Sequence, residues 1–207
     1  MKMRRSSLAI LAVGLWAGAA RADVVIDFAA LAAPGAGAVA VGSPYVEDGF
    51  EFSSTSVNSA FSSWEAQSAN FAGSTGLFNS AAEQTTILRK VGGGAFDLVS
   101  IALAFYSSGD GQQVPVNFTG TRADASTVQQ GFVLAPTFGF HTYSFVGFED
   151  VVSVAWVQQA GFHQFDDVRI ASSSAVPEPA SLAMLGVGAL GAPRLARRRQ
   201  ARRTERR

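Results

Sequence analysis

An acidic pair close to a histidine is the polar cluster of this sequence best suited to bind a metal ion or take part in chemistry. Asp166 and Asp167 follow His163 by three and four residues. Calcium prefers several oxygen ligands, often carboxylates together with backbone carbonyls from loops. If the last strand pairs beside the first, Asp166 could meet Asp27 or Asp48 and hold a structural calcium ion. The alternative is that Asp166 bonds backbone amides at a strand end while Asp167 is solvated.

The two histidines of the chain offer little sign of catalysis. His141 alternates with Tyr143 and Phe145, which is typical of a strand residue at the edge of a core. His163 precedes the final strand, where we expect a turn residue bonded to the backbone rather than a metal ligand. The chain has no cysteine, so disulfides, thiolate catalysis and Cys-ligated zinc are excluded.

No enzyme signature is present in the sequence. It lacks H-E-x-x-H, G-x-S-x-G, a Walker loop and an EF-hand loop. A glycosidase needs two carboxylates across a cleft, but the many acidic residues of the chain make such a pair possible by chance alone. We therefore predict a protein that is not an enzyme and has no catalytic residues; the alternative is a secreted β-sandwich hydrolase acting on polysaccharide.

Aromatic residues provide the candidates for sugar binding. Trp64 and Phe61 lie in a Ser- and Asn-rich segment, with Tyr45 behind them. Exposed aromatic faces stack on the apolar faces of ligands, so these three residues form a candidate carbohydrate site. The alternative for Trp64 is a loop anchor packed on the domain. Trp156 alternates with valines and is expected in the core.

Residues 23–171 must supply the elements that position these side chains. Their apolar residues recur with a period of two, separated by Gly, Pro, Ser and Asp turn signals, and no long amphipathic helix is visible. We therefore predict an all-β fold, an antiparallel, jelly-roll-like β-sandwich. Two segments, Ala29–Gly42 and Ser53–Gly76, are expected as long loops, possible sites of short strands. The predicted core includes Phe52, Ile101, Leu103, Phe118, Val154, Trp156, Val168 and Ile170.

Charge is strongly segregated along the chain. The formal net charge is zero, yet residues 23–176 hold 14 acidic and four basic residues, a net charge of −10. Such a body repels phosphate backbones, so we predict no nucleic-acid partner. Twelve of the 16 basic residues lie at the two ends, where they form part of targeting segments.

The N-terminal segment has the three parts of a secretory signal peptide: a positive start, an apolar run and small residues at a cleavage site. The apolar run is too short to span a bilayer comfortably. We expect signal peptidase to cleave after residue 22; a retained membrane anchor is the alternative. The parts are residues 1–7, Leu8–Ala20, and Ala20 with Ala22 before Asp23.

A second three-part signal closes the chain after a short linker, residues 172–175. The motif Val176, Pro177, Glu178, Pro179 is followed by an apolar segment, 180–193, and an Arg-rich end, 194–207. Clustered arginines that stop an apolar segment indicate a transmembrane segment with its basic end in the cytoplasm. Glycines and a proline weaken it as a helix, which suits transient anchoring in the inner membrane. A permanent anchor without processing is the alternative.

This order of features closely resembles the PEP-CTERM sorting signal. The resemblance covers about the last 32 residues and implies processing by an exosortase in a bacterium that makes exopolysaccharide. The middle of the chain is similar to a β-sandwich ectodomain type that accompanies such tails, through Asp48-Gly49-Phe50-x-Phe52 and Phe165-Asp166-x-Val168. The resemblance implies an exported, non-catalytic protein of the cell surface, extracellular matrix or biofilm, with exopolysaccharide as the expected ligand.

Overall fold

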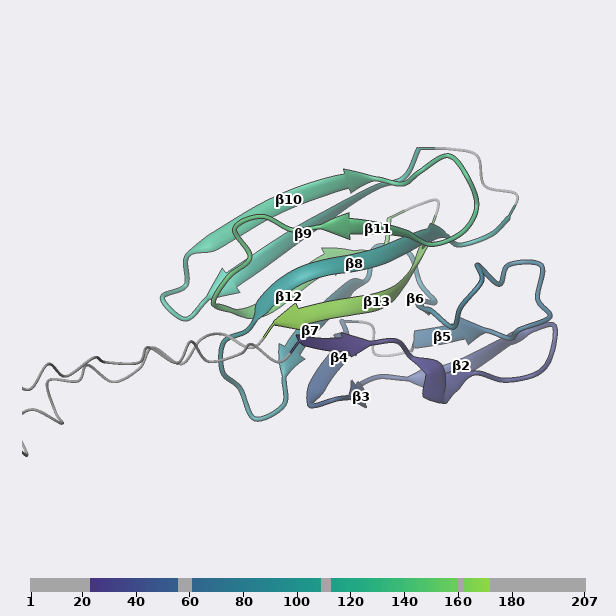
Figure 1. Ribbon diagram of the computed structural model, residues 1–207, viewed down its shortest axis with the longest axis horizontal. Coiled ribbons are helices and arrows are strands. Elements are labelled where there is room, and N and C mark those ends of the chain that lie inside the picture. Colours follow the sequence, from purple (N-terminus) through teal and green to yellow (C-terminus); the bar gives the residue numbers. More distant parts are fainter. Residues whose placement is uncertain (1–22, 56–60, 109–112, 160–161, 172–207) are drawn as a thin grey trace, which may run out of the picture. The chain divides into compact units, whose positions relative to one another are not determined.

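The computed structural model describes residues 23–55, 61–108, 113–159 and 162–171, and these form two antiparallel β-sheets packed face to face (Figure 1). This architecture confirms the predicted all-β sandwich. The described residues contain one single-turn 3₁₀ helix, Ala29–Leu31, and no helix among them is long and apolar enough to cross a membrane. The predicted signal peptide, linker and C-terminal sorting segment lie outside the described residues.

The front sheet of Figure 1, sheet A, has the strand order β11-β8-β13-β6-β5-β2. The last strand, β13, is its centre: β8 pairs along one side, while β1 and β6 share the other side. The first strand therefore lies beside the last, which is the condition set for the calcium hypothesis. The strands are β1 (Asp23–Ile26), β2 (Ala38–Gly42), β5 (Phe61–Trp64), β6 (Leu77–Asn79), β8 (Asp97–Phe105), β11 (His141–Ser144) and β13 (His163–Ala171).

The rear sheet, sheet B, has the order β10-β9-β12-β7-β4-β3. Every pairing is antiparallel, so alternate side chains point into the sandwich and out to solvent. The strands are β3 (Tyr45–Glu47), β4 (Phe50–Ser54), β7 (Thr85–Lys90), β9 (Pro115–Arg122), β10 (Thr127–Val133) and β12 (Val151–Val157). Short strands β2 and β5 lie in the two segments expected as long loops, where short strands were an open possibility.

The core between the sheets is rich in phenylalanine, and all eight core residues predicted from the alternation are buried. Phe165 on β13 is its centre, with ring centroids 5.7 Å from Phe28, 5.7 Å from Phe52, 6.2 Å from Phe61 and 5.1 Å from Trp156. These rings come from both sheets. The aromatic packing therefore holds β13 in place, and this also fixes the positions from which the outward-facing side chains of β13 extend.

Candidate functional site

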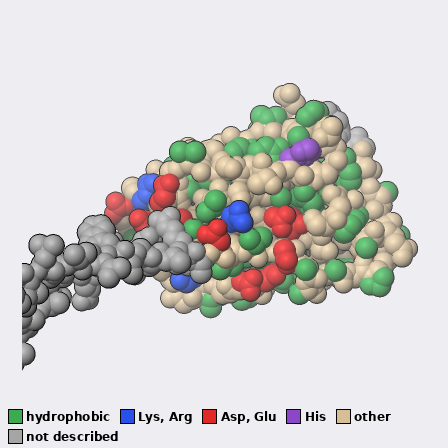
Figure 2. All heavy atoms as spheres, in the orientation of Figure 1, with side chains coloured by type: hydrophobic (Ala, Val, Ile, Leu, Met, Phe, Trp, Pro, Cys, Tyr) green, Lys and Arg blue, Asp and Glu red, His purple; other side chains and the backbone are tan. Residues whose placement is uncertain are grey.

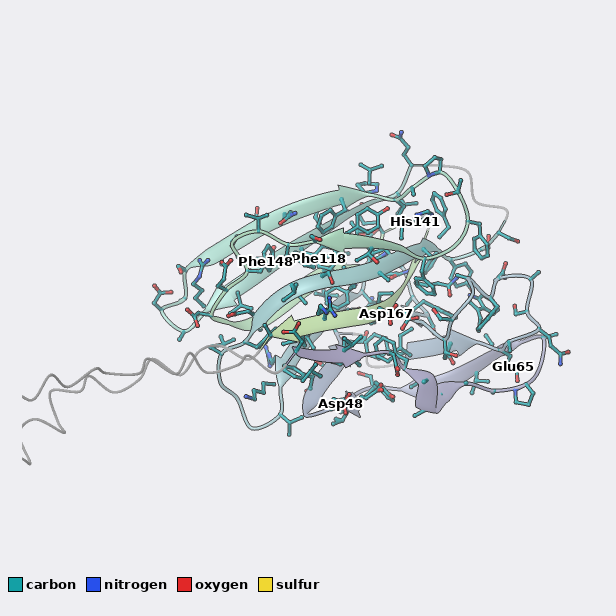
Figure 3. The ribbon with its side chains drawn as sticks, viewed as in Figure 1. Asp48, Glu65, Phe118, His141, Phe148 and Asp167 are labelled. Carbon is teal, nitrogen blue, oxygen red and sulfur yellow. The ribbon has the colours of Figure 1, made fainter. Side chains whose placement is uncertain are left out.

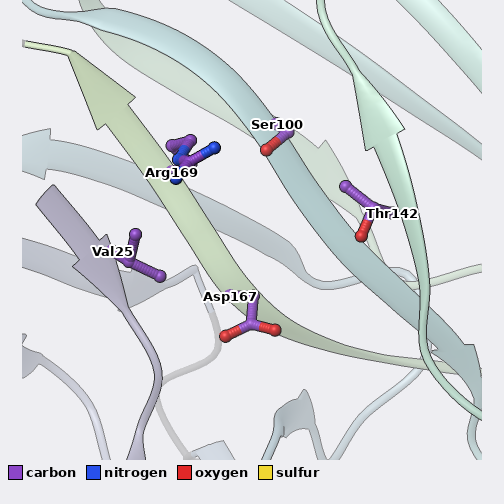
Figure 4. A pocket seen from close by; sticks show the side chains of 5 residues that line it. All are labelled: Val25, Ser100, Thr142, Asp167 and Arg169. Atoms are coloured by element: carbon purple, nitrogen blue, oxygen red, sulfur yellow. The ribbon is translucent and has the colours of Figure 1, made fainter. Parts of the chain in front are cut away.

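A pocket of about 260 Å³ lies on the outer face of sheet A (Figure 4). Its floor is a row of directly paired residues across three strands: Val25 on β1 pairs with Arg169 on β13, which pairs with Ser100 on β8. Thr142 on β11 and Asp167 on β13 complete the lining. Because directly paired residues point to the same face of a sheet, the strand register itself assembles the pocket.

A β-bulge in β13 places Asp167 at this pocket. Between the pairs Asp166–Ala102 and Arg169–Ser100, β13 advances by three residues while β8 advances by two. The extra residue breaks the alternation, and Asp167 takes a left-handed backbone conformation with φ of 42°. Asp167 is exposed and lines the pocket together with Arg169, two residues further along β13 (Figure 4).

The pocket combines hydrogen-bond donors and acceptors with one apolar side chain. The Arg169 guanidinium donates hydrogen bonds, the Asp167 carboxylate accepts them, and the Ser100 and Thr142 hydroxyls do both. Val25 adds an apolar side. The Arg169 Nε lies 3.9 Å from an Asp23 carboxylate oxygen, and both side chains are about half exposed, so this ion pair leaves Arg169 available. Figure 2 shows this face, with a basic side chain near its centre flanked by acidic ones.

Asp166 is buried below the surface rather than in the pocket. Its carboxylate accepts hydrogen bonds from the Ser74 hydroxyl and from the Asp167 backbone N–H, the latter at 2.8 Å, and 1% of the residue is exposed. Burial raises the pKa of Asp166 to about 7, aided by the charges of Asp167 and Asp27 and opposed by the two hydrogen bonds. The arrangement agrees with the alternative considered for Asp166 in its bond to a backbone amide and in the exposure of Asp167, but Asp166 lies within β13 and not at a strand end.

The carboxylates expected to bind calcium are not gathered around one point. Among the described residues, no group of three or more His, Asp or Glu side chains lies close enough together to hold a metal ion. Asp27 is exposed, and its Oδ1 accepts a hydrogen bond from the Ala29 N–H at 3.0 Å. Asp48 is exposed in the β3–β4 turn, away from Asp167 (Figure 3). A calcium site at Asp166, Asp27 and Asp48 stays a prediction without support from this geometry.

His163 occupies a different place from the one expected. It is the first residue of β13 and fully buried, and neither ring nitrogen has a hydrogen-bond partner among the described residues, so the prediction of a backbone-bonded turn residue is wrong. Burial lowers the pKa of His163 to about 3, which keeps the ring neutral. His141 lies in β11, half-buried, as expected of a strand residue at the core edge.

The three aromatic candidates have separate roles. Phe61 is fully buried and points into the core, so it offers no face to a sugar. Trp64 is half-buried: its indole N–H donates to the Tyr106 carbonyl at 3.1 Å, and its ring packs 5.2 Å from Phe78, which is the anchoring role named as the alternative. Tyr45 packs on the core, and its hydroxyl donates to Glu47 at 2.7 Å.

Sequence reasoning singled out Asp167, as one of the acidic pair, but missed the other residues that line the pocket. Val25, Ser100, Thr142 and Arg169 come from four strands, and no local motif joins them. The signal that would have found them is the pairing of β13 with β1 and β8, which depends on long-range register. The supposition that the last strand pairs beside the first is the part of the sequence reasoning that leads to this face.

One comparison with known proteins identifies the C-terminal tail. Residues 175–200 match the family model described as the PEP-CTERM protein-sorting motif. A search of curated proteins gave no match.

Several solved structures are similar to the chain, among them two carbohydrate-binding modules and a tailspike domain. A mutant of CBM29-2, a family 29 carbohydrate-binding module, has 10% identity and a TM-score of 0.43, covering 77% of this chain and 99% of that one. The family 32 module of C. perfringens NanJ, in complex with galactose, has 14% identity and a TM-score of 0.36, covering 59% and 92%. The enzymatically active domain of bacteriophage CBA120 tailspike protein 4 has 10% identity and a TM-score of 0.27, covering 60% and 18%.

Proposed function

We propose that this chain, an exported protein with a PEP-CTERM sorting motif, is a non-catalytic protein of the cell surface or extracellular matrix that binds exopolysaccharide in the sheet A pocket. The observation that carries the proposal is the lining of that pocket. Donors, acceptors and an apolar side chain converge there from four strands of a rigid sheet. Sites built on strands hold their side chains more precisely than sites built on loops.

The size of the pocket supports a small binding unit. Pockets for drug-sized ligands measure about 300–1,000 Å³, and a volume of about 260 Å³ suits a single sugar ring of a longer chain. Such a ring presents hydroxyls around its edge and C–H groups on its faces. Arg169, Asp167, Ser100 and Thr142 match the hydroxyls, and Val25 matches an apolar face.

The arrangement of carboxylates supports binding over hydrolysis. Hydrolysis of a glycosidic bond ordinarily needs two carboxyl groups flanking it, at about 5–10 Å from each other. Among the residues lining the pocket, Asp167 supplies the one carboxylate. Its neighbour Asp166 has the raised pKa that suits a general acid, but Ser74 covers it and 1% of the residue is exposed. The lining of the pocket therefore offers one carboxylate, whereas ordinary glycoside hydrolysis needs two.

Export and processing make a prediction about the mature chain. We expect signal peptidase to cleave before Asp23 and an exosortase to act near Pro177-Glu178-Pro179, after transient anchoring in the inner membrane. The extracellular protein should then start at Asp23 and lack Arg194–Arg207. Intact-mass measurement of the extracellular form checks both ends. A mass that includes the arginine-rich end would refute the processing.

If the sheet A pocket binds exopolysaccharide, a variant with a damaged pocket should migrate faster than wild type in a gel that contains this polysaccharide. Native gels cast with exopolysaccharide purified from the host should slow the wild-type protein. Arg169→Ala removes the guanidinium donors of the pocket and should raise the dissociation constant about tenfold, equivalent to about 1.4 kcal/mol. Arg89→Ala is the matched control, because Arg89 is an exposed residue of sheet B that pairs with Glu51. Equal retardation of wild type and Arg169→Ala would contradict the proposal.

A further inference from the structure

A second pocket, of about 410 Å³, lies on the other side of the sandwich, on the β9–β10 hairpin of sheet B. Because the two sheets pack through their inner faces, an outward-facing pocket on sheet B opens away from the one on sheet A. The residues that line it carry no charge: Asn117, Phe118, Thr119, Gln129, Gln130 and Gly131.

Strand register identifies the side chains that face a ligand. Asn117 pairs with Gly131, and Thr119 pairs with Gln129, so these two pairs share the outer face. Phe118 belongs to the core. Gln130 also points away, because its amide group bonds the Ser144 carbonyl at 3.0 Å and the Val146 N–H at 2.9 Å.

Three polar side chains therefore remain available in this pocket: Asn117, Thr119 and Gln129. None of them makes a hydrogen bond to another of the described residues. Asn117 and Gln129 are exposed, and Thr119 is half-buried. Each can donate and accept hydrogen bonds at once.

Gly131 shapes this site by lacking a side chain. A Cβ added there would lie 2.5 Å from Asn117 Oδ1, which is closer than real Cβ contacts allow. The Asn117 amide can therefore lie across the neighbouring strand only because position 131 is glycine. On the other side of β9, Thr119 pairs with Ala155 of β12. Because alanine is small, β12 does not obstruct the pocket on that side.

We propose that this hairpin is a second saccharide-binding site, selective for a neutral sugar chain. Planar amides and a hydroxyl match the paired donors and acceptors of sugar hydroxyls. A charged sugar would find no counter-charge among the lining residues, and the net charge of −10 over residues 23–176 repels an anionic one. The occupant is thus a neutral polysaccharide rather than a uronic acid polymer.

Two sites that open on opposite faces would let one protein molecule hold two polysaccharide chains. This cross-linking role rests on the proposed function of the sheet A pocket, whereas the sheet B site stands on its own residues. Bivalency raises avidity for a polymer without any new contact, provided that both sites can be engaged together.

Titration calorimetry tests the second site directly. The full chain, in a detergent without sugar groups, is titrated with neutral hexasaccharides of glucose, galactose and mannose. At least one should bind with two sites per protein. Asn117→Ala and Gly131→Ala should each leave one site, and Arg169→Ala should leave the other. Unchanged thermal unfolding of each variant shows that the fold is retained.

The outcomes separate the second site from the proposed function. One site that disappears in Arg169→Ala and is untouched by Asn117→Ala would overturn the second site and leave the proposed function standing. No binding of the three neutral hexasaccharides would also overturn it. A control titration with a hexauronate or a glucosamine hexamer then shows whether the sheet A pocket takes a charged saccharide instead. Two sites that persist in both Asn117→Ala and Gly131→Ala would place the second site elsewhere and refute this assignment.

Discussion

The variant His163→Leu should resist acid better than the wild-type protein. His163 is fully buried with its pKa lowered to about 3, whereas an unfolded chain gives histidine a pKa of about 6.5. Between these values the unfolded state binds a proton that the folded state does not. The contribution of His163 to wild-type stability therefore falls as pH drops below 6.5, and this loss stops near pH 3. Leucine has no proton to bind, so the variant escapes this loss.

Asp166 gives stability the opposite dependence on pH, over nearly the same pH range. Its pKa is about 7 in the folded protein and about 3.9 in an unfolded chain. As pH rises between these values, the unfolded state releases a proton that the folded state keeps, so stability falls with rising pH. Between pH 4 and 6.5, the contributions of His163 and Asp166 have opposite slopes and largely cancel. In a variant that lacks one of the two groups, the pH dependence of the unfolding free energy shows the contribution of the other group.

Urea unfolding at several pH values measures both slopes. Relative to wild type, His163→Leu should gain about 3 kcal/mol in unfolding free energy between pH 7 and pH 4.5. Asp166→Asn should instead gain about 3 kcal/mol between pH 4.5 and pH 7, since asparagine keeps an acceptor for the Asp167 N–H. Comparison with wild type cancels the titration of the other acidic residues. A pH-independent difference for His163→Leu would mean that the ring is accessible to protons in the folded state.

Replacing Phe165 with alanine should cost about 3–5 kcal/mol of unfolding free energy. The Phe165 ring is fully buried and contacts aromatic rings from both sheets, including Phe52 on β4 and Trp156 on β12. Removing it leaves a cavity that the stiff strands around it cannot close. Because β13 also carries two pocket residues, Asp167 and Arg169, the variant should weaken saccharide binding as well.

Val146→Ala is the control for this prediction, since Val146 is 78% exposed and should change stability by less than about 0.5 kcal/mol. Both variants are compared with wild type by urea unfolding at pH 7. A cost below about 1 kcal/mol for Phe165→Ala would show that the core repacks around the missing ring, and that β13 is not held by it.

The alternation of apolar residues predicted the sandwich and its core, because inward positions such as Leu103 and Phe118 repeat with the period of a strand. Exposure of the aromatic candidates could not be predicted in the same way. Phe61 stands in a Ser-rich segment that reads as a loop, yet β5 pairs with β6 and turns this side chain inward. Composition alone does not distinguish a loop from a short strand, because a short strand depends on its partners for stability.

The pocket was even less predictable than the core. The bulge that presents Asp167 arises from a mismatch of one residue between β13 and β8, which nothing in the local sequence encodes visibly. Arg169 and Ser100 meet although 69 positions separate them. The burial of Asp166 under Ser74 likewise joins residues that are 92 positions apart. A site whose residues are brought together by the pairing of strands far apart in the sequence can be recognised only when the arrangement of the whole sheet is known.

Saccharide binding by the sheet A pocket is the central claim, and a glycan-array screen tests it most directly. Wild-type protein and Arg169→Ala, each with an intact fold by thermal unfolding, are applied to the same array of neutral, amino and acidic glycans. We predict that wild type binds a restricted set of glycans and that Arg169→Ala loses at least one of them. An array on which wild type binds no glycan, or on which both proteins give identical patterns, would contradict the claim.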